Sequence, residues 1–363
     1  MIYKKIIRPI LFLTPAEFAH DLALFYLSIY NKVNFLNNIL FHVLGTTTPR
    51  LRQKLFGLYF RTPIGLPAGM DKNIKAPRTW SSFGFAWCQL GSITYMPQKG
   101  NPKPRLWRLK QDKGLVINYG LSNLGAKKSA EILANVKKSR GLWSISIAKS
   151  NDTPMEQAAQ DYEKSFNILG KYADIITINL SCPNVKNFGG LQKPELLEPI
   201  LTKITKINTH KKPIWIKIGI DLNKDELDGI ISLVKKYKID AIVATNLSKD
   251  KSQLTLKSPN QSKPGSVSGL PIQQKADKII AYLYQNCENK FKIIGTGGIF
   301  DAQDAYTKIK AGASLLQVAT GFIYGGPTTI RNINLGLDKL LAKNNFKHIS
   351  QAVGIEAKNY KYE

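Results

Sequence analysis

Cysteine, histidine and acidic side chains are scarce in this 363-residue sequence, and its apolar stretches are short. The three Cys and four His are widely spaced, which excludes a disulfide framework and makes a metal site unexpected. Such sparse cysteine usage is typical of a reducing, intracellular compartment. No window of uninterrupted apolar residues reaches the length of a membrane span, so we expect no transmembrane helix. Residues 10–13 are apolar but too few for a cleavable signal.

Basic residues outnumber acidic ones, with 52 Lys and Arg against 25 Asp and Glu, for a formal net charge of +27. A field of this sign favours anionic partners such as nucleic acid, anionic lipid or acidic metabolites. The alternative is a lysine-rich composition spread over solvated faces. The basic residues are dispersed in short pairs such as Lys127-Lys128, and no RNA-binding signature accompanies them. We therefore expect no nucleic-acid partner.

From residue 50 onward, short apolar runs alternate with helical patterns, which favours a parallel α/β architecture. Eight predicted strands and their helices indicate a (β/α)8 TIM barrel, and a doubly wound open sheet is the alternative. Residues 92–142 read as an insertion with short strands of its own. The predicted strands are 63–68, 86–91, 143–148, 174–180, 213–218, 240–245, 292–296 and 314–318, and the predicted helices are 156–171, 195–207, 224–238, 273–286 and 301–310.

Residues 1–45 differ from the rest and are predicted to form an N-terminal helical extension before a barrel domain at 46–363. The stretch Thr14-Pro15-Ala16-Glu17 has the spacing of a capping box. One apolar stripe follows it and a second precedes Gly45. Two short amphipathic helices with basic flanks suit attachment to an anionic membrane interface, although the stripes could equally pack on the main domain. The stripes are Phe18, Leu22, Phe25, Ile29 and Leu36, Ile39, Leu40, Val43, Leu44, and the basic flanks are Lys4, Lys5, Arg8 and Lys32.

The stretch 174–184 changes abruptly from buried-strand residues to polar ones. Asn179, Ser181, Cys182 and Asn184 follow the apolar run within six residues. Function collects where buried parallel strands end, so this cluster is a candidate site. The alternative is that Cys182 is a small buried hydrophobe beside a turn.

Other predicted strands also end in residues suited to a phosphate-bearing cofactor. Glycine pairs after the last two strands would offer backbone N–H groups to a phosphate. Lys72 and Lys217 would both point into the barrel mouth, where buried lysines imply a bound anion or an electron-rich ring. No G-x-G-x-x-G opens a βαβ unit, so a dinucleotide fold is not predicted. A flavin mononucleotide, FMN, satisfies these features.

These motifs lie in a chain that resembles the dihydroorotate dehydrogenases, and most closely their class 2, quinone-using, membrane-associated branch. The resemblance covers almost the whole chain in order. The matching stretches are FLTPAEFAHDLAL (12–24), PIGLPAGMDKN (63–73), GNPKPRLWRL (100–109), NDTPMEQ (151–157), NLSCPN (179–184), IKI (216–218), ATN (244–246), SGLPIQ (268–273), GTGGI (295–299) and GFIYGGP (321–327).

The resemblance implies oxidation of dihydroorotate to orotate in pyrimidine synthesis, with FMN as hydride acceptor and a membrane quinone as final acceptor. It implies a peripheral protein on the cytoplasmic face of a bacterial-type inner membrane, without an obligate protein partner. FMN would be held by Ala68, Gly69, Lys72, Ser92, Ser146, Asn179, Lys217, Thr245, Ser268, Gly269, Gly297, Gly298 and Thr320. The substrate would be held by Lys72, Asn118, Tyr119, Gly120, Leu121, Asn179, Asn184 and Asn246, and His20 and Arg108 would line the quinone tunnel.

The implied chemistry removes hydrogen from the C5–C6 bond of the substrate, which needs a base for the C5 proton and an acceptor for the C6 hydride. Cys182 is the predicted base. A thiol with an ordinary pKa near ~8.5 is a far better base at neutral pH than a hydroxyl. Asn side chains offer both donors and acceptors to the edges of a pyrimidine.

Several positions depart from the family pattern. Cys182 stands where class 2 has Ser and is typical of the soluble class 1 branch. Ile117 occupies the usual place of a substrate Asn, with Asn118 one position later, and Ser146, Ala319 and Val185 replace an Asn, a Tyr and a Thr. Two alternatives therefore stay open: a related FMN barrel with another dihydropyrimidine or a soluble acceptor, and a catalytically silent, membrane-docked flavin-binding protein.

Overall fold

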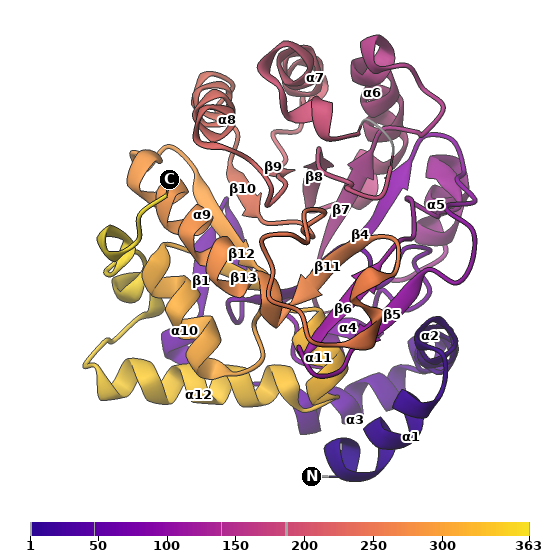
Figure 1. The fold of residues 1–363 in the computed structure, drawn as a ribbon, viewed down its shortest axis with the longest axis vertical. Helices are drawn as coiled ribbons and strands as arrows, with labels where there is room; N and C mark the ends of the chain where they lie inside the picture. Colours follow the sequence, from indigo (N-terminus) through magenta and orange to yellow (C-terminus); the bar gives the residue numbers. More distant parts are fainter. Residues whose placement is uncertain (1, 47, 139, 186–187, 363) are drawn as a thin grey trace.

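Eight parallel strands close into a barrel in this computed structural model, which describes residues 2–46, 48–138, 140–185 and 188–362 (Figure 1). The predicted barrel is confirmed, and the open-sheet alternative is wrong. Each predicted strand overlaps one strand of the barrel. In their order around the barrel, the strands are β10 (Ala241–Ala244), β12 (Lys292–Thr296), β13 (Leu315–Gln317), β3 (Ile64–Leu66), β4 (Trp87–Thr94), β7 (Leu142–Ala148), β8 (Ile175–Asn179) and β9 (Ile214–Lys217).

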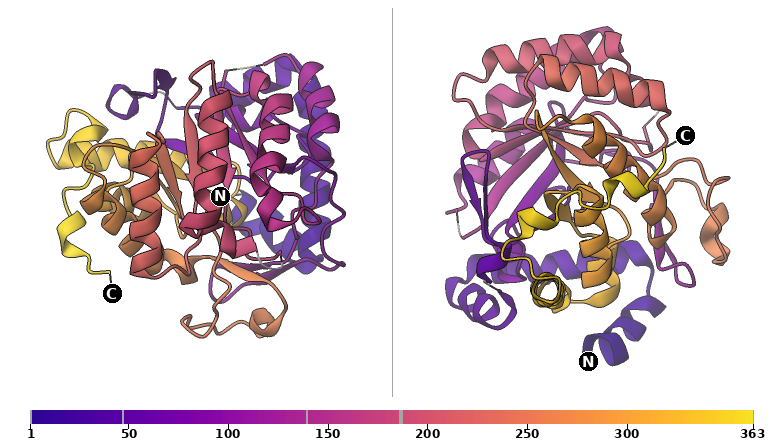
Figure 2. Two further views of the ribbon diagram at one scale, coloured as in Figure 1. Left: turned by 90° about the horizontal axis from the view of Figure 1, so that it is seen from above. Right: turned by 90° about the vertical axis from the view of Figure 1, so that its left-hand side faces the viewer.

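Helices cover the outside of the barrel, and the five predicted helical patterns are confirmed to within a few residues (Figure 2). Genuine capping boxes start two of them, at Asn223 with Glu226 and at Asp301 with Asp304. The helices are α4 (Thr79–Ser82), α5 (Gly125–Ala134), α6 (Ala158–Leu169), α7 (Pro194–Ile207), α8 (Lys224–Lys236), α9 (Gln273–Asn286), α10 (Ala302–Ala311), α11 (Thr320–Gly325) and α12 (Thr329–Lys343). Short 3-10 turns lie at Pro49–Leu51, Met155–Gln157, Gly170–Tyr172, Phe188–Gln192, Pro259–Ser262, Leu270–Ile272, Ile349–Ala352 and Ala357–Asn359.

Aromatic side chains close the end of the barrel where the strands begin. The hairpin of β1 (Gln53–Leu55) and β2 (Leu58–Phe60) brings Phe60 against Trp87, with ring centroids 5.4 Å apart. Trp87 in turn packs edge-on against Trp215 at 6.1 Å. All three side chains are buried. Because this end is filled by rings, the opposite end, where the strands finish, is left for a site.

A three-stranded antiparallel sheet lies beyond the carboxyl ends of the barrel strands. Its strands are β5 (Leu106–Leu109), β6 (Gly114–Ile117) and β11 (Ser266–Gly269), in the order β11-β6-β5. The insertion at 92–142 was expected to carry short strands, and it does. The third strand, β11, was not expected, because it comes from a distant loop whose four residues have no periodic pattern.

The N-terminal extension is helical, but its cap is not the predicted one. It comprises η1 (Tyr3–Ile7), α1 (Arg8–Leu13), α2 (Ala16–Lys32) and α3 (Asn34–Leu44), of which the first two were not predicted. The Thr14 hydroxyl donates backwards to the Leu11 carbonyl, and no side chain caps α2. The capping-box interpretation is therefore wrong, although the helix does begin beside Pro15.

The predicted apolar stripe on α2 faces outward. Phe18, Phe25 and Ile29 are exposed, whereas the buried positions of this helix are Glu17, Leu24 and Asn31. The alternative that this stripe packs on the barrel therefore does not hold for these three residues. On α3, Ile39 and Val43 are likewise exposed while Leu44 is buried. Two helices that turn apolar side chains outward are typical of an interfacial segment. Within the described ranges, none of the helices combines the length and the hydropathy of a membrane span.

An ion pair fixes α2 to the sheet beside the barrel mouth. One carboxylate oxygen of Glu17 accepts hydrogen bonds from Nε and Nη2 of Arg105, at 2.9 and 2.6 Å. The other accepts from the Arg105 backbone N–H at 3.0 Å. Burial alone would raise the pKa of Glu17, but the hydrogen bonds and charge of Arg105 lower it. The residue that was read as part of a cap is thus the polar anchor of the helix.

Replacing Glu17 by Gln tests this anchor. The change leaves the Arg105 guanidinium buried without a carboxylate, so the free energy of local opening of α2 should fall by about 2 kcal/mol or more. Amide hydrogen exchange in α2 measures this quantity. Glu163→Gln is the control, because Glu163 pairs with Lys203 at a more solvated position and its loss should cost less than about 1 kcal/mol. Equal effects of the two changes would contradict the anchoring role.

Candidate active site

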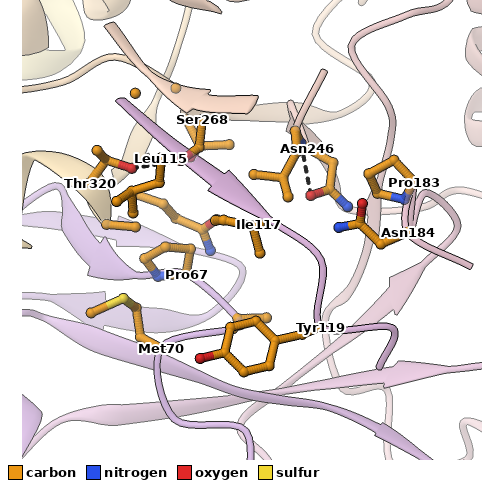
Figure 3. Close-up of a pocket in the computed structure, with 18 of the residues that line it drawn as sticks. Pro67, Met70, Leu115, Ile117, Tyr119, Pro183, Asn184, Asn246, Ser268 and Thr320 are labelled. Atoms are coloured by element: carbon orange, nitrogen blue, oxygen red, sulfur yellow. Dashed lines mark hydrogen bonds between the residues drawn. The ribbon is translucent and has the colours of Figure 1, made fainter. Parts of the chain in front are cut away.

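A cavity opens where the barrel strands end, and it gathers most of the predicted site residues (Figure 3). The three-stranded sheet and α2 form its outer wall. The predicted residues that line it are His20, Ala68, Gly69, Lys72, Ser92, Tyr119, Gly120, Leu121, Asn179, Cys182, Asn184, Lys217, Thr245, Asn246, Ser268, Gly269, Gly297, Gly298 and Thr320. Ser146, Asn118 and Arg108 are not among the lining residues.

Two lysines reach this cavity, and neither forms an ion pair with any residue in the described part of the chain. Burial lowers the pKa of Lys217 to about 8. Burial also lowers the pKa of Lys72 to about 8, helped by the charge of Arg105 and opposed by Asp71, Asp21 and Glu17. Two buried ammonium groups without carboxylate contacts favour a bound anion or electron-rich ring.

Asp71 shapes the loop that presents Lys72. Its two carboxylate oxygens accept hydrogen bonds from the backbone N–H groups of Lys75 and Ala76, at 2.7 and 2.8 Å. The indole of Trp80 donates to the same carboxylate at 3.1 Å. Asp71 is wholly buried, so this loop cannot move without breaking three hydrogen bonds at a charged acceptor. The carboxylate therefore serves the loop and does not contact the Lys72 ammonium.

A chain of hydrogen bonds orients Asn179 at the end of β8. Its Nδ2 donates to the Ser92 hydroxyl at 2.8 Å, and that hydroxyl is 2.8 Å from the Ser146 hydroxyl. The hydroxyl of Tyr162 donates to the Asn179 carbonyl at 2.6 Å. Ser146 thus lies behind Ser92 and touches the cavity only through it.

Cys182 lies in the cavity wall, and its thiol is not acidified. Burial raises the pKa of Cys182 to about 11, against the lowering influence of backbone N–H groups and of the Lys217 charge. The expectation of an ordinary thiol pKa is therefore wrong for this state of the protein. A thiol with this pKa is almost wholly protonated at neutral pH, but its rare thiolate is a strong base.

Asn184 and Asn246 both line the cavity, and their carboxamides point toward each other in Figure 3. Oδ1 of Asn184 accepts a hydrogen bond from the Ser266 hydroxyl at 2.9 Å. Nδ2 of Asn246 donates to the Ser181 carbonyl at 2.5 Å, and its Oδ1 accepts from the Leu247 N–H at 2.9 Å. Asn246 is therefore oriented by its own neighbours, and its Oδ1 keeps a second lone pair for a ring N–H.

The one-residue shift at Ile117 and Asn118 turns the amide away from the cavity. Ile117 lines the cavity, whereas Oδ1 of Asn118 accepts a hydrogen bond from Nδ2 of Asn101 at 2.9 Å. Alternation along a strand gives neighbouring residues opposite faces, which explains the difference. The apolar side chain therefore stands at the place expected for a polar contact.

The two residues predicted for a quinone tunnel lie in different surroundings. His20, on α2, lines the cavity, and burial together with the charges of Lys72 and Lys75 lowers its pKa to about 3. Its imidazole is therefore neutral. Arg108 instead donates to the carbonyls of Thr14 and Leu11, at 2.6 and 3.0 Å, and so holds the link between α1 and α2.

Two glutamines inside the barrel were missed from the sequence. Gln317, on β13, lines the cavity and donates from Nε2 to Oε1 of Gln89 at 3.3 Å. Gln89 donates in turn to the Thr177 hydroxyl at 2.7 Å. The sequence does contain a signal for them, because each glutamine interrupts the apolar run of a predicted strand, 86–91 or 314–318.

The cavity fits a phosphate-bearing cofactor with a polar ring. Buried Oε1 of Gln317 and Oγ1 of Thr245 have no hydrogen-bond partner in the described residues, so both are free to meet such a ring. Gly297 and Gly298, at the end of β12, have φ values of +104° and +71°, which only glycine adopts without strain. Their turn exposes backbone N–H groups, as a phosphate cradle requires. The fold and the position of the cavity together define a TIM-barrel enzyme.

Comparisons with known proteins narrow this class. A model of the family "Dihydroorotate dehydrogenase" matches residues 50–341. The dihydroorotate dehydrogenase (quinone) of Nostoc punctiforme is 41% identical over 375 residues, covering 99% of this chain and 100% of that protein. The enzyme of the same name from Crocosphaera subtropica is 43% identical over 316 residues, covering 85% and 83%. The DHODH of Eimeria tenella, solved in complex with ferulenol, is similar with a TM-score of 0.85 at 28% identity, covering 94% of this chain and 96% of that one.

The chain belongs to the dihydroorotate dehydrogenase family, whose members are flavin-dependent. The resemblance stated from the motifs is thereby confirmed. The class 2 branch is confirmed as well, because the relatives that match over the whole chain carry the quinone designation. The presence of Cys182, which is typical of class 1, does not change the assignment to class 2.

Alkylation by iodoacetamide, mapped by peptide mass spectrometry, tests the state of Cys182. Because only the thiolate reacts, the rate at Cys182 should rise about tenfold per pH unit from neutral pH without a plateau near pH 9. Cys88 is the internal control: burial raises its pKa even further, so it should react more slowly at every pH. A plateau near an ordinary thiol pKa would contradict the effect of burial.

Proposed function

We propose that this protein is a class 2 dihydroorotate dehydrogenase, which oxidises dihydroorotate to orotate with bound FMN and passes the electrons to a membrane quinone. One observation carries the proposal. Two unpaired lysines, three asparagines and a thiol converge on a single cavity at the strand ends of a flavin-family barrel. The substrate is an anion with a pyrimidine ring, and these groups match its carboxylate, its polar edges and its acidic carbon.

FMN would be held by residues from several strand ends. The turn at Gly297 and Gly298, together with Thr320, would hold the phosphate, and Lys217, Asn179 and Thr245 would hold the ring system. Gln317 adds an acceptor for a ring N–H, since its Oε1 is unpartnered. When bound, FMN supplies the acceptor for the C6 hydride.

Cys182 would take the C5 proton at Sγ. Its raised pKa makes the thiolate scarce but strongly basic, so proton removal should become faster as the pH rises toward that value. The Lys217 charge is the one nearby side-chain influence that favours the thiolate. The Cys182 base thus works within a class 2 frame, where burial rather than acidification sets its strength.

The substrate would be oriented by charge and by amides. The Lys72 ammonium neutralises the carboxylate, while Asn179, Asn184 and Asn246 hold the ring, the last through its Oδ1. A related FMN barrel acting on another dihydropyrimidine is the second candidate. It is favoured by Ile117, which lines the cavity in place of an amide.

The outward face of α2 and α3 would rest on an anionic membrane surface, at the cytoplasmic side of a bacterial-type inner membrane. Phe18, Phe25 and Ile39 are exposed on this face, and Lys4, Lys5 and Lys32 flank it. A quinone from that membrane would approach the flavin past His20, on the inner side of α2. Neutral His20 adds no charge to an apolar route.

Anaerobic mixing with dihydroorotate tests the function. The flavin absorbance of the purified holoenzyme should bleach within seconds to minutes. Cys182→Ala should retain FMN but bleach at least about 100-fold more slowly, because proton abstraction has lost its base. If the wild-type flavin stays oxidised while another dihydropyrimidine reduces it, the second candidate is correct.

Vesicle flotation tests the membrane face. Phe25→Glu should weaken binding to vesicles that contain anionic phosphatidylglycerol several-fold, because it places a carboxylate in the proposed interface. Tyr59→Glu is a matched control, since Tyr59 has the same 55% exposure but lies on β2 at the other end of the barrel. Dye-linked dihydroorotate oxidation should be equal in both variants. Equal flotation of the two variants would refute the interface.

A further inference from the structure

The ring of Tyr119, labelled in Figure 3, lines the cavity. Two cations lie against this ring. Nζ of Lys72 is 3.7 Å from the ring centroid. The guanidinium carbon of Arg105 is 4.8 Å from the same centroid. Both distances are within the range of a cation–π interaction. Lys72 thus has an aromatic face where a carboxylate would ordinarily lie.

The polar end of Tyr119 takes no part in this arrangement. Its hydroxyl is buried and has no hydrogen-bond partner among the residues that the structure describes. A buried hydroxyl without a partner costs free energy, so it does not explain why the ring is held here. The part of Tyr119 that contacts charged groups is its π face.

Arg105 connects this ring to the N-terminal extension. The Glu17 carboxylate on α2 accepts three hydrogen bonds from Arg105, and Nη1 of Arg105 donates to the Lys99 carbonyl at 3.3 Å. With its guanidinium fixed at these points, Arg105 cannot follow the ring if the ring moves. Glu17, Arg105, Tyr119 and Lys72 therefore form a continuous series of contacts from α2 to the barrel mouth.

We infer that Tyr119 is a positioning residue, whose ring holds the Lys72 ammonium in place for an anionic substrate and ties it through Arg105 to α2. This inference rests on the proposed function, because it concerns the dihydroorotate site. It assigns the side chain of Tyr119 to Lys72 and not to the substrate ring. It also gives the N-terminal helix a structural connection to the substrate site in addition to its place beside the membrane.

Four other charged groups influence the pKa of Lys72. Arg105 disfavours the ammonium, while Asp71 on its own loop and Asp21 and Glu17 on α2 favour it, and His20 is neutral. A change confined to the electron density of the Tyr119 ring leaves the charge of each group unchanged, and among them Arg105, which contacts the ring, is fixed by its bonds to Glu17 and Lys99. Any shift in the behaviour of Lys72 then reports on the ring.

The test replaces Tyr119 by phenylalanine and by mono-, di- and trifluorinated phenylalanine in the holoenzyme. Fluorine withdraws density from the π face with little change in ring size. Orotate affinity, measured by calorimetry, should fall stepwise along the series, by about threefold to tenfold in total. The pH above which affinity is lost, where Lys72 deprotonates, should move down by about half a unit to one unit, because a weaker ring stabilises the ammonium less.

Phenylalanine at position 119 is the reference of the series, since it keeps the ring and removes only the unpartnered hydroxyl. Fluorinated phenylalanine at Phe85 is the control, because that buried ring contacts Trp80 and Phe322 and no cation is recorded over it in the described structure. Thermal melts should show equal stability along both series. Affinity and pH dependence that stay constant across the Tyr119 series, in a wild-type holoenzyme that dihydroorotate reduces, would overturn the inference alone. A wild-type flavin that dihydroorotate does not reduce would overturn the proposed function instead.

Discussion

Two lysine ammonium groups lie in the mouth of the barrel without a carboxylate in contact, and the rest of the site depends on this unbalanced charge. Lys72 and Lys217 have pKa values of about 8 because burial disfavours their charged forms. A cavity with this electrostatic character binds an anion readily and binds a cation poorly. The substrate carboxylate, proposed to meet Lys72, would bring the missing negative charge, so ligand binding and charge compensation would be one event.

Two carboxylates near this cavity hold the surrounding backbone in place and do not contact the lysines. Asp71 is adjacent to Lys72 in sequence, yet it binds two backbone N–H groups and the Trp80 indole. Glu17 is near enough to influence Lys72, yet it binds Arg105. Each carboxylate fixes an element that borders the site, a loop in one case and α2 in the other. This arrangement leaves the ammonium groups available while keeping the surrounding backbone rigid, as a preorganised anion site requires.

The sequence allowed the barrel and most of the cavity to be predicted, because both follow from local patterns. Buried strands such as Ile175–Asn179 are short apolar runs, and polar residues directly after them must meet at one end of a closed barrel. The errors have a common cause in long-range contacts. Glu17 looked like a cap because Arg105, the residue that it binds, lies 88 residues away. The orientation of Asn118 also depends on a partner elsewhere in the chain. Its side chain is turned toward Asn101, which donates a hydrogen bond to it.

Cys182, the proposed base, is of the kind typical of class 1, yet it lies in a class 2 frame. A thiol must be deprotonated to act as a base. An exposed thiol with a lowered pKa would be deprotonated more often, but its thiolate would be a weaker base. Here burial raises the pKa of Cys182 while Lys217, the neighbouring cation, lowers it. Lys217 itself loses its proton more readily because it is buried. Because the pKa of Lys217 lies below that of Cys182, Lys217 loses its proton first as the pH rises, so at neutral pH its ammonium is present to stabilise the rare thiolate. The proposed base would then depend on the local field inside the barrel, and the electron acceptor on the N-terminal helices, so the two features need not change together.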